Sequence, residues 1–337
     1  MNGEDVTLNI AIIGAAGFVG TNLALAAEQR GHRLTLLDVS DRLGRLEASG
    51  LLERADCHFL DLAQPGARIP DCDVMISLAA LPQVDFSLHH PERTFTNNIG
   101  IMSAVLEAAR LRRIPLLFAS SIEVYGGNDG DLLTESSELR PLSPYAASKI
   151  ACESLTESYQ HVYDTVSTTV RLTNLYGPWQ APDRIIPRIT AQALLGIESE
   201  AVTGRLRDFL AVQDAVGVLL DLAENGPWGE TFNLAAGRHT PLEEAAEAVI
   251  GTAGRGSFVT RDVPQADGRG SSLVATSAHL TEVTGWKPTT DLWDGVGLTT
   301  DWYRDHRAWW APFEAQVRAD RSGPEFLLDH AFPFWAN

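Results

Sequence analysis

The chain has 337 residues, of which 45% are hydrophobic and 21% are charged, as expected of a soluble globular protein with more than one lobe. Its 44 acidic residues outnumber its 26 basic ones, and the formal charge of −18 argues against nucleic acid or an acidic membrane as a partner. No apolar run approaches the ~20 residues that span a bilayer. The start, MNGEDV, lacks the basic segment of a signal peptide, and the three cysteines show no metal or redox spacing. We therefore expect a cytoplasmic protein without a bound metal.

Strands and helices alternate along the first half of the sequence. Short apolar runs that end in glycine, aspartate or serine are followed by segments of helical spacing, which is typical of a doubly wound parallel sheet. The pattern loosens after the Gly177-Pro178 break. We expect strands at 8–13, 32–38, 73–80, 114–121 and 167–177, helices at 21–31, 98–113, 145–163, 184–196 and 242–254, and a strand, turn and helix over 207–225.

These elements predict a Rossmann-type α/β fold in two parts. The first part is a dinucleotide-binding domain over 1–175, to which 209–236 return. The second part is a smaller, mixed substrate-binding lobe made by 176–208 and 237–337, with an aromatic-rich C-terminal extension.

A glycine-rich loop follows the first strand. Gly14, Gly17 and Gly20 have the spacing that allows a tight turn, close approach of the backbone to a pyrophosphate, and a helix N-terminus facing the anion. Asp38 ends the second strand, where a carboxylate accepts hydrogen bonds from both hydroxyls of an adenosine ribose and repels a 2′-phosphate. This pattern predicts NAD rather than NADP as the cofactor. The alternative is a turn that glycines merely shape, beside a solvated aspartate.

A tyrosine and a lysine lie four residues apart in SPYAASK. Tyr145 and Lys149 therefore share one face of a predicted helix, one turn apart. A phenol with a pKa near ~10 is a poor base at neutral pH, but a neighbouring ammonium favours the phenolate and lowers that pKa. Tyr145 is then able to take a proton from a substrate hydroxyl while hydride leaves the same carbon for NAD. The alternative is a surface pair on an ordinary helix.

With these motifs together, the chain resembles an extended short-chain dehydrogenase/reductase of the nucleotide-sugar epimerase/dehydratase type. The likeness runs from about residue 9 to about residue 304. The resemblance implies a nucleotide-diphosphate sugar as substrate and a homodimer formed through two helices, here 99–113 and 146–162. It is carried by GAAGFVG, Asp38, DL at 61–62, SLAA at 77–80, SSIEVYG, SPYAASK, VRLTNLYGPWQ, RDFLAVQD and GWKP at 285–288.

The resemblance also implies a set of site residues. Ser121 matches the hydroxyl that bonds the reacting sugar oxygen. Asn174 and Arg207 match groups that contact the nucleotide diphosphate. Taken alone, Arg207 is equally well explained as a surface residue paired with Asp208. The Asp61-Leu62 pair matches the positions that line the adenine. The implied cofactor-binding residues are Gly14, Gly17, Phe18, Val19, Gly20, Asp38, Asp61, Leu62, Ala79, Ala80, Asn97, Tyr145 and Lys149.

Three reactions start alike, with oxidation of the sugar at C4. A 4-epimerase needs little beyond Ser121, Tyr145 and NAD, and we expect this reaction through a transient 4-keto sugar. A 4,6-dehydratase usually carries an Asp-Glu pair before VYG, and here the Asp position is Ile122, which cannot donate a proton. Ser-x-Glu without that Asp is similar to nucleotide-sugar decarboxylases. Decarboxylation or dehydration using Glu123 is therefore the alternative, and a non-catalytic NAD-binding sensor or scaffold is a third.

Strand alternation would place Ser121 and Glu123 on one face, pointing into one site. Glu123 is then a catalytic carboxylate, or a polar residue that bonds local backbone or a ribose.

The sequence departs from the family pattern at three places. Position 77 is serine where many relatives carry histidine, and Arg269 is the candidate for a later phosphate arginine although Thr276 replaces an expected aspartate. The last ~30 residues extend beyond the usual family end. Their aromatic side chains are expected to pack on the body or on a second subunit rather than to form a substrate box; they are Trp309, Trp310, Phe332, Phe334 and Trp335.

Overall fold

The computed structural model describes residues 7–39, 43–64, 66–127, 131–262 and 272–319. These residues divide into two compact units. The first unit lies within Met1–Val124, Ser143–Arg171 and Val216–Phe232, and the second within Tyr125–Leu142, Leu172–Ala215 and Asn233–Asn337. Arg269, Phe332, Phe334 and Trp335 fall outside the described residues.

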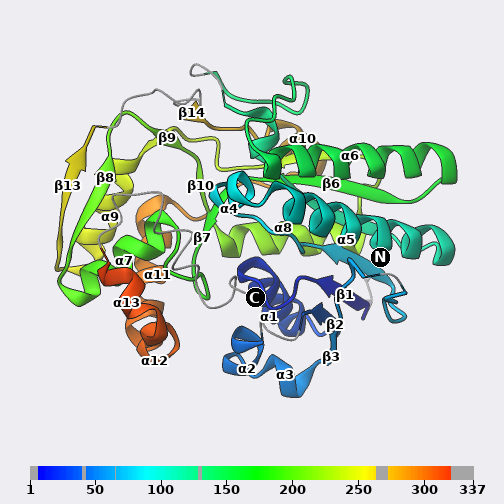
Figure 1. Cartoon of the computed structure of the whole chain (residues 1–337), viewed down its shortest axis with the longest axis horizontal. Helices are drawn as coiled ribbons and strands as arrows, with labels where there is room; N and C mark the ends of the chain where they lie inside the picture. Colours follow the sequence, from blue (N-terminus) through cyan, green and yellow to red (C-terminus); the bar gives the residue numbers. More distant parts are fainter. Residues whose placement is uncertain (1–6, 40–42, 65, 128–130, 263–271, 320–337) are drawn as a thin grey trace. The chain divides into compact units, whose positions relative to one another are not determined.

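A seven-stranded sheet runs through the first unit in the order β11-β6-β5-β4-β1-β2-β3. Figure 1 labels β1, β2, β3 and β6 of this sheet. Its central ladders are parallel, and β1 pairs with β2 on one side and with β4 on the other. The winding therefore reverses at β1, where doubly wound folds place their ligands at the carboxyl ends of the strands. The predicted α/β class is confirmed. The strands are β1 Asn9–Ile13, β2 Arg33–Asp38, β3 Asp56–Phe59, β4 Val74–Ser77, β5 Leu116–Ser121, β6 Ser167–Leu172 and β11 Thr231–Leu234, with the last residues of β6 and β11 in the second unit.

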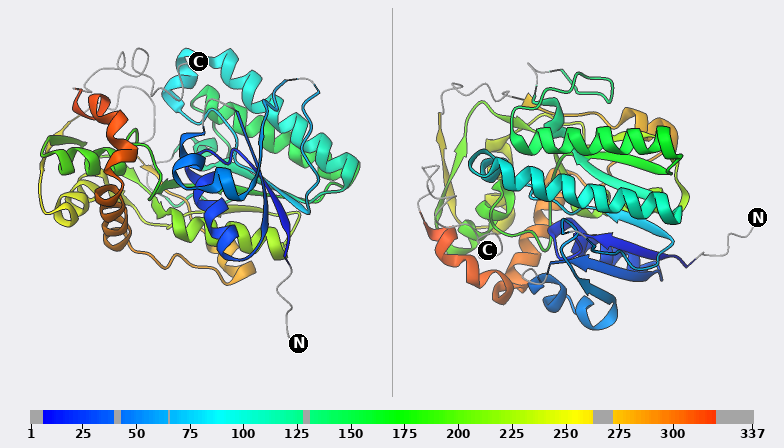
Figure 2. Two further views of the ribbon diagram at one scale, coloured as in Figure 1. Left: turned by 90° about the horizontal axis from the view of Figure 1, so that it is seen from below. Right: turned by 45° about the vertical axis from the view of Figure 1, so that its right-hand side comes forward.

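Helices cover the sheet of the first unit. Side chains of α5 and α6 pack on β1, β4 and β5 in one apolar cluster that includes Met75, Val105 and Phe118, and the two helices lie side by side in Figures 1 and 2. The helices are α1 Phe18–Gln29, α2 Gly44–Ala48, α3 Leu51–Arg54, α4 Val84–His89, α5 Pro91–Arg112, the 3-10 helix η2 Ile122–Tyr125, α6 Pro144–Tyr163 and α8 Val212–Asn225, with the last residue of η2 and the first turn of α8 in the second unit.

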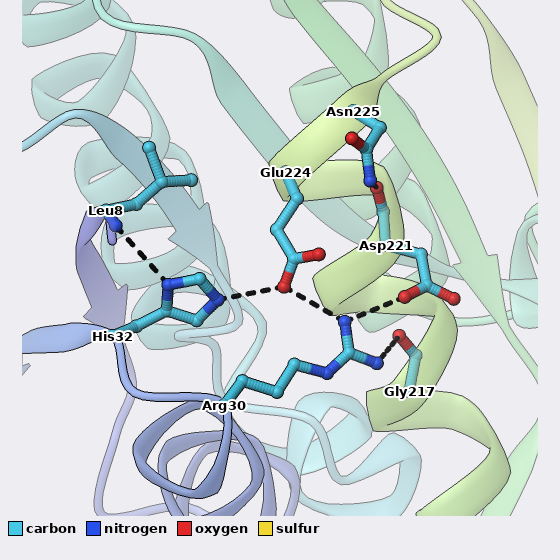
Figure 3. Close-up of polar contacts among 7 residues, drawn as sticks. All are labelled: Leu8, Arg30, His32, Gly217, Asp221, Glu224 and Asn225. Atoms are coloured by element: carbon cyan, nitrogen blue, oxygen red, sulfur yellow. Dashed lines mark hydrogen bonds and ion pairs between the residues drawn. The ribbon is translucent and has the colours of Figure 1, made fainter. Parts of the chain in front are cut away.

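A polar network holds α8 in the first unit (Figure 3). Arg30, at the end of α1, donates to Asp221 at 2.7 Å and to Glu224 at 2.9 Å on α8. His32 Nε2 lies 2.8 Å from Glu224, and His32 Nδ1 accepts the backbone N–H of Leu8 at 3.3 Å. Because Nδ1 is an acceptor, Nε2 carries the proton that is donated to Glu224. Helix α8 is thereby bonded to the end of α1 and to the residues that precede β1 and β2.

The second unit contains three small sheets of mixed direction. β10 pairs in parallel with β7, β13 pairs in parallel with β8, and β9 lies between antiparallel β12 and parallel β14. The strands are β7 Asn174–Tyr176, β8 Glu198–Val202, β9 Leu206–Arg207, β10 Phe209–Ala211, β12 Thr240–Pro241, β13 Ser257–Arg261 and β14 Ser272–Leu273. The helices are α7 Ile185–Leu195, α9 Leu242–Ala253, α10 Ala278–Thr284, α11 Leu292–Asp305, α12 Arg307–Trp310, the 3-10 helix η3 Ala311–Phe313 and α13 Glu314–Arg318.

An aromatic cluster in the second unit surrounds Trp179. This residue occupies a tight turn with φ 66°, a conformation that L side chains rarely adopt, and its ring lies 5.0 Å from that of Trp302 and 5.7 Å from that of Trp309. Trp310 is fully buried and donates from Nε1 to the carbonyl of Tyr303 at 2.7 Å. The described part of the C-terminal extension is therefore packed into the second unit. Within the described ranges, no helix has the length and apolar character needed to cross a membrane.

Candidate active site

The glycine loop joins β1 to α1 at the carboxyl edge of the sheet. Gly14 has φ 87°, and a Cβ there would lie 2.7 Å from the backbone nitrogen of Ala79. A Cβ on Gly20 would lie 2.2 Å from the carbonyl oxygen of Gly14. Gly17 precedes Phe18 and Val19 at the start of α1 and offers no side chain to cap the first turn. The first-turn N–H groups are thus of the kind that binds a pyrophosphate.

Asp38 is bonded to this loop. Its Oδ2 accepts the N–H of Ala16 and its Oδ1 accepts the N–H of Val39, both at 2.8 Å. The loop is further held by bonds from the N–H groups of Gly14 and Ala15 to the carbonyl of Leu37. These two bonds fix the side chain of Asp38 beside the loop.

The other predicted cofactor residues lie around the strand ends of the first unit. Asp61, after β3, is exposed and Leu62 is buried in the apolar cluster under α5. Ala79 and Ala80 are half-buried directly after β4, next to the glycine loop. The half-buried Asn97 donates to its neighbour Asn98, at 3.1 Å.

Asn98 is a buried polar residue that the sequence pattern did not single out. Its Oδ1 accepts the N–H of Leu81 at 2.8 Å, and its Nδ2 donates to the hydroxyl of Ser148 at 2.9 Å. It therefore ties the loop after β4 to α6. The sequence alone cannot distinguish it from Asn97, because the two adjacent asparagines differ only in the helix face that they occupy.

Ser121 ends β5, and its side chain organises the turn that follows. The expectation that strand alternation places Glu123 beside Ser121 was wrong, because Ile122–Tyr125 form a 3-10 helix rather than a continuation of the strand. The two residues are nevertheless adjacent, since the Ser121 hydroxyl accepts the N–H of Glu123 at 3.2 Å. Ile122 is 2% exposed. The backbone of the half-buried Glu123 is thereby held next to the serine hydroxyl at a strand end.

Tyr145 and Lys149 lie one turn apart on α6, as predicted. The helix begins with Ser143, whose side chain caps the N–H of Ala146, and Pro144 occupies its first turn. Both Tyr145 and Lys149 are buried. Lys149 Nζ donates to the carbonyl of Ala119 on β5 at 2.8 Å and lies 5.0 Å from the ring centre of Phe118.

Burial lowers the pKa of Lys149, and the charge of Glu153 acts against this effect. Desolvation disfavours an ammonium because it removes the water that stabilises the charge. A bound dinucleotide ribose and a phenolate at Tyr145 are groups that would restore a favourable setting for that charge. The pair is therefore buried and is not a solvated surface contact.

Asn174 and Arg207 lie close together in the second unit. Asn174 begins β7 and pairs with Phe209 of β10, while Arg207 ends β9. The Nδ2 of Asn174 donates to the carbonyl of Asp208 at 3.1 Å. The carboxylate of Asp208 is fully buried and accepts the N–H groups of Ala236 and Gly237, both at 3.1 Å. Asp208 is therefore a buried anchor beside the two predicted substrate residues.

Asp208 should make the stability of the protein depend on pH. Burial raises the pKa of Asp208 to about 7, against the opposing effect of its backbone N–H donors. Because this folded-state pKa lies above the ~3.9 of an unfolded aspartate, the stabilisation is complete below that value and is lost as pH rises through about 7. From about pH 5 to about pH 8, we expect the free energy of unfolding of the wild type to fall by on the order of 2 kcal/mol relative to Asp208→Asn. Urea titrations of both proteins test this, and parallel pH profiles would contradict it.

The residues of the first unit fit NAD. In the glycine loop, backbone packs on backbone too closely at Gly14 and Gly20 for any side chain, Asp38 is held beside that loop, and Lys149 is a buried donor near the end of β5. Among the described residues, no group of three or more histidine, cysteine or acidic side chains is arranged to hold a metal ion.

Comparison with known proteins places these motifs in context. The profile of the NAD dependent epimerase/dehydratase family matches residues 10–235. The dTDP-glucose 4,6-dehydratase of Xanthomonas campestris pv. campestris (strain B100) is 30% identical, over 88% of this chain and 93% of the relative. The dTDP-glucose 4,6-dehydratase of Streptomyces antibioticus is 28% identical, over 94% of this chain and 98% of the relative.

Solved structures show the same fold. The UDP-N-acetylglucosamine 4-epimerase from Methanobrevibacter ruminantium M1 superimposes with a TM-score of 0.81 at 24% identity, covering 89% of this chain and 99% of its own. DesIV, a dTDP-glucose 4,6-dehydratase from Streptomyces venezuelae, gives a TM-score of 0.80 at 23% identity, covering 90% and 99%. The profile and sequence matches confirm the resemblance drawn from the motifs and, with it, NAD as the cofactor. They also support dehydration better than the 4-epimerisation that we expected.

Proposed function

The chain belongs to the NAD dependent epimerase/dehydratase family and is an enzyme of that family, and on this premise we propose that it is a nucleotide-sugar 4,6-dehydratase that uses Glu123 as its single catalytic carboxylate. The observation that carries the proposal is the hydrogen bond from the backbone N–H of Glu123 to the Ser121 hydroxyl, which holds the two residues together at the end of the strand that also receives Lys149. The names of the most similar sequences support the same reaction. The first substrate to test is dTDP-glucose, with Asn174 and Arg207 binding its diphosphate.

The first step is oxidation of the sugar at C4. Ser121 donates to the C4 oxygen, and Tyr145 removes the proton of the C4 hydroxyl. Lys149 stabilises the phenolate of Tyr145 and holds the nicotinamide ribose. Bound NAD supplies a hydride acceptor, which takes the C4 hydride and returns it at the end of the cycle. The product of this step is a 4-keto sugar whose C5 proton is acidified by the neighbouring carbonyl.

Elimination of water then needs one base and one acid, and a single carboxylate can serve as both. Glu123 takes the proton from C5, the C6–O bond breaks, and the same proton leaves with the C6 hydroxyl as water. The bound cofactor would supply the hydride that reduces C6, and Tyr145 would return to C5 the proton that it took from the C4 hydroxyl. The overall change in the sugar is the loss of one water molecule. Ile122 at the usual aspartate position therefore does not by itself prevent dehydration.

Glu123→Gln tests this assignment. The amide cannot take the C5 proton, so we expect water loss from dTDP-glucose to fall by about 10²–10⁴-fold, while oxidation at C4 and NAD binding persist. Mass spectrometry and NMR of the sugar product measure the reaction, since dehydration lowers the mass by about 18 Da, the mass of one water molecule. A Glu123→Gln enzyme that still releases water at the wild-type rate would refute the role of Glu123.

A second candidate is 4-epimerisation, and Ile122 favours it. An apolar residue that is 2% exposed occupies the position at which dehydratases carry their acid. Incubation with UDP-, dTDP-, GDP- and CDP-hexoses separates the candidates. A product of unchanged mass with inverted C4 as the main outcome would overturn dehydration in favour of epimerisation, and loss of carbon dioxide from a uronate would favour decarboxylation.

A further inference from the structure

We propose that Glu153 and Arg171 form a buried ion pair that sets the charge state of Lys149 and holds the helix of Tyr145 against the strand of Ser121, so that both are positioning residues of the catalytic centre. The proposal deepens the function proposed above and rests on it for the role of Lys149.

One carboxylate connects three elements of the first unit. Glu153 lies on α6, one turn beyond Lys149 and two turns beyond Tyr145. Arg171 of β6 donates to it in a bidentate manner, with Nη2 2.7 Å from Oε2 and Nε 3.0 Å from Oε1. The Ser120 hydroxyl of β5 donates to the same carboxylate. The Glu153 and Arg171 side chains are only 11% and 7% exposed.

This arrangement fixes the distance between the catalytic groups. Ser120 immediately precedes Ser121, so a bond from Ser120 to α6 also locates the end of β5 relative to Tyr145. The bond from Lys149 to the carbonyl of Ala119 adds a second connection between the same two elements. Bidentate pairing with an arginine restricts the rotamer of Glu153 more than a single bond would.

Among the described residues, two titratable groups act on the charge of Lys149. On α6 the groups that act on it are Cys152 and Glu153, and on β5 it meets the ring of Phe118 and the carbonyl of Ala119. Arg171 of β6 is paired with the carboxylate of Glu153. Burial raises the pKa of Cys152 to about 11, so its thiol is uncharged at neutral pH. The ionised group that acts on Lys149 is therefore Glu153, which favours the ammonium, and the guanidinium paired with Glu153 offsets part of that charge.

The composition of the chain points to the same position. Lys149 and Lys287 are its two lysines, whereas the other 24 of its 26 basic residues are arginine. A guanidinium stays protonated in proteins, while an ammonium can lose its proton when neighbouring groups change. Position 149 thus carries a cation whose charge its neighbours can adjust.

The proposal predicts that the pH at which Lys149 titrates moves in opposite directions when either partner of the ion pair is replaced. Glu153→Gln keeps the size of the side chain and removes the negative charge beside Lys149, so the Lys149 ammonium should titrate at lower pH. Arg171→Met leaves the Glu153 carboxylate without its partner, so Lys149 should titrate at higher pH. A pair with a purely structural role would change stability in both variants without shifting Lys149 in opposite directions.

The experiment follows Lys149 itself by NMR in the full chain with ¹³Cε-labelled lysine. Two resonances are expected, and Lys287→Arg assigns them. We expect the Lys149 midpoint to move down by about one pH unit in Glu153→Gln and up by a similar amount in Arg171→Met. The double variant, which removes both charges, should return close to the wild type, as should Glu153→Asp.

Glu107→Gln is the matched control, because Glu107 accepts a hydrogen bond from Tyr159 on the same helix but is not among the groups that face Lys149. It should leave the midpoint unchanged. The proposal would be overturned if the Lys149 midpoint moved in the same direction in the two single variants, or if it moved in neither. If a single variant does not fold, the double variant and Glu153→Asp decide the question. A Lys149 midpoint displaced from the wild-type value in either of these would also overturn the proposal. Because this readout needs no turnover, it stays valid if the sugar panel refutes dehydration.

Discussion

Tyr145→Phe is expected to lower kcat by about 10²–10⁴-fold on every sugar that the wild type accepts, because the only group removed is the one that takes the C4 hydroxyl proton. The ring is buried, so phenylalanine preserves the packing of α6. KM should change little, since the phenol acts mainly in the transition state. Steady-state kinetics with the best sugar of the panel measure both parameters.

Controls for this variant distinguish a catalytic from a structural effect. NAD affinity, followed by a fluorescence titration, and the urea midpoint should stay close to the wild-type values. Unchanged turnover of every accepted sugar would show that the catalytic assignment of Tyr145 is incorrect. Absence of turnover in the wild type across the whole panel, together with normal NAD binding, would instead favour the non-catalytic sensor or scaffold.

Gly20→Ala is expected to produce the largest loss of stability. The added Cβ would lie 2.2 Å from the carbonyl oxygen of Gly14 and 2.8 Å from Cα of Ala15, and both are backbone atoms that cannot move aside like a flexible side chain. Overpacking of this kind costs about 1–3 kcal/mol or more. We expect a destabilisation of about 3 kcal/mol and at least tenfold weaker NAD binding, since 1.4 kcal/mol of lost contact is a tenfold change.

Gly217→Ala provides the matched control within the same unit. Gly217 lies in α8, and a Cβ at this position would meet nothing within 4 Å. Because alanine favours a helix over glycine by about 0.8–1.0 kcal/mol, this variant should be slightly more stable than the wild type. Urea unfolding and NAD titration of the two variants side by side test the difference. Equal tolerance of both substitutions would contradict the close packing of the glycine loop.

Features that depend on local spacing were predictable from the sequence. The glycine loop, Asp38 and the Tyr145-Lys149 pair each follow from residues that are close in the chain or from a strand end, and the structure places them at strand ends or on one helix face. Ser121 and Glu123 were predicted as neighbours for the wrong reason. The 3-10 turn at Ile122–Tyr125 cannot be read from an apolar strand pattern, because a run such as SSIEVYG is compatible with both conformations.

Contacts between residues distant in the chain were not predictable in this way. Asp208 bonds the N–H groups of Ala236 and Gly237, and Glu153 bonds Arg171, across 28, 29 and 18 residues respectively. Nothing in the composition near either carboxylate identifies its partner. One signal was present for Glu153, since it continues the helical stripe of Tyr145 and Lys149 by one further turn.

The aromatic cluster around Trp179 gives the two units different optical properties. Of the seven tryptophans that the structure describes, Trp228 lies in the first unit and the other six lie in the second. Four of those six belong to one cluster of neighbouring aromatic side chains, namely Trp179, Trp302, Trp309 and Trp310. Intrinsic fluorescence will therefore report chiefly on the second unit, whereas NAD binding reports on the first. Following both signals through one urea titration would separate the unfolding of the two units without any added label.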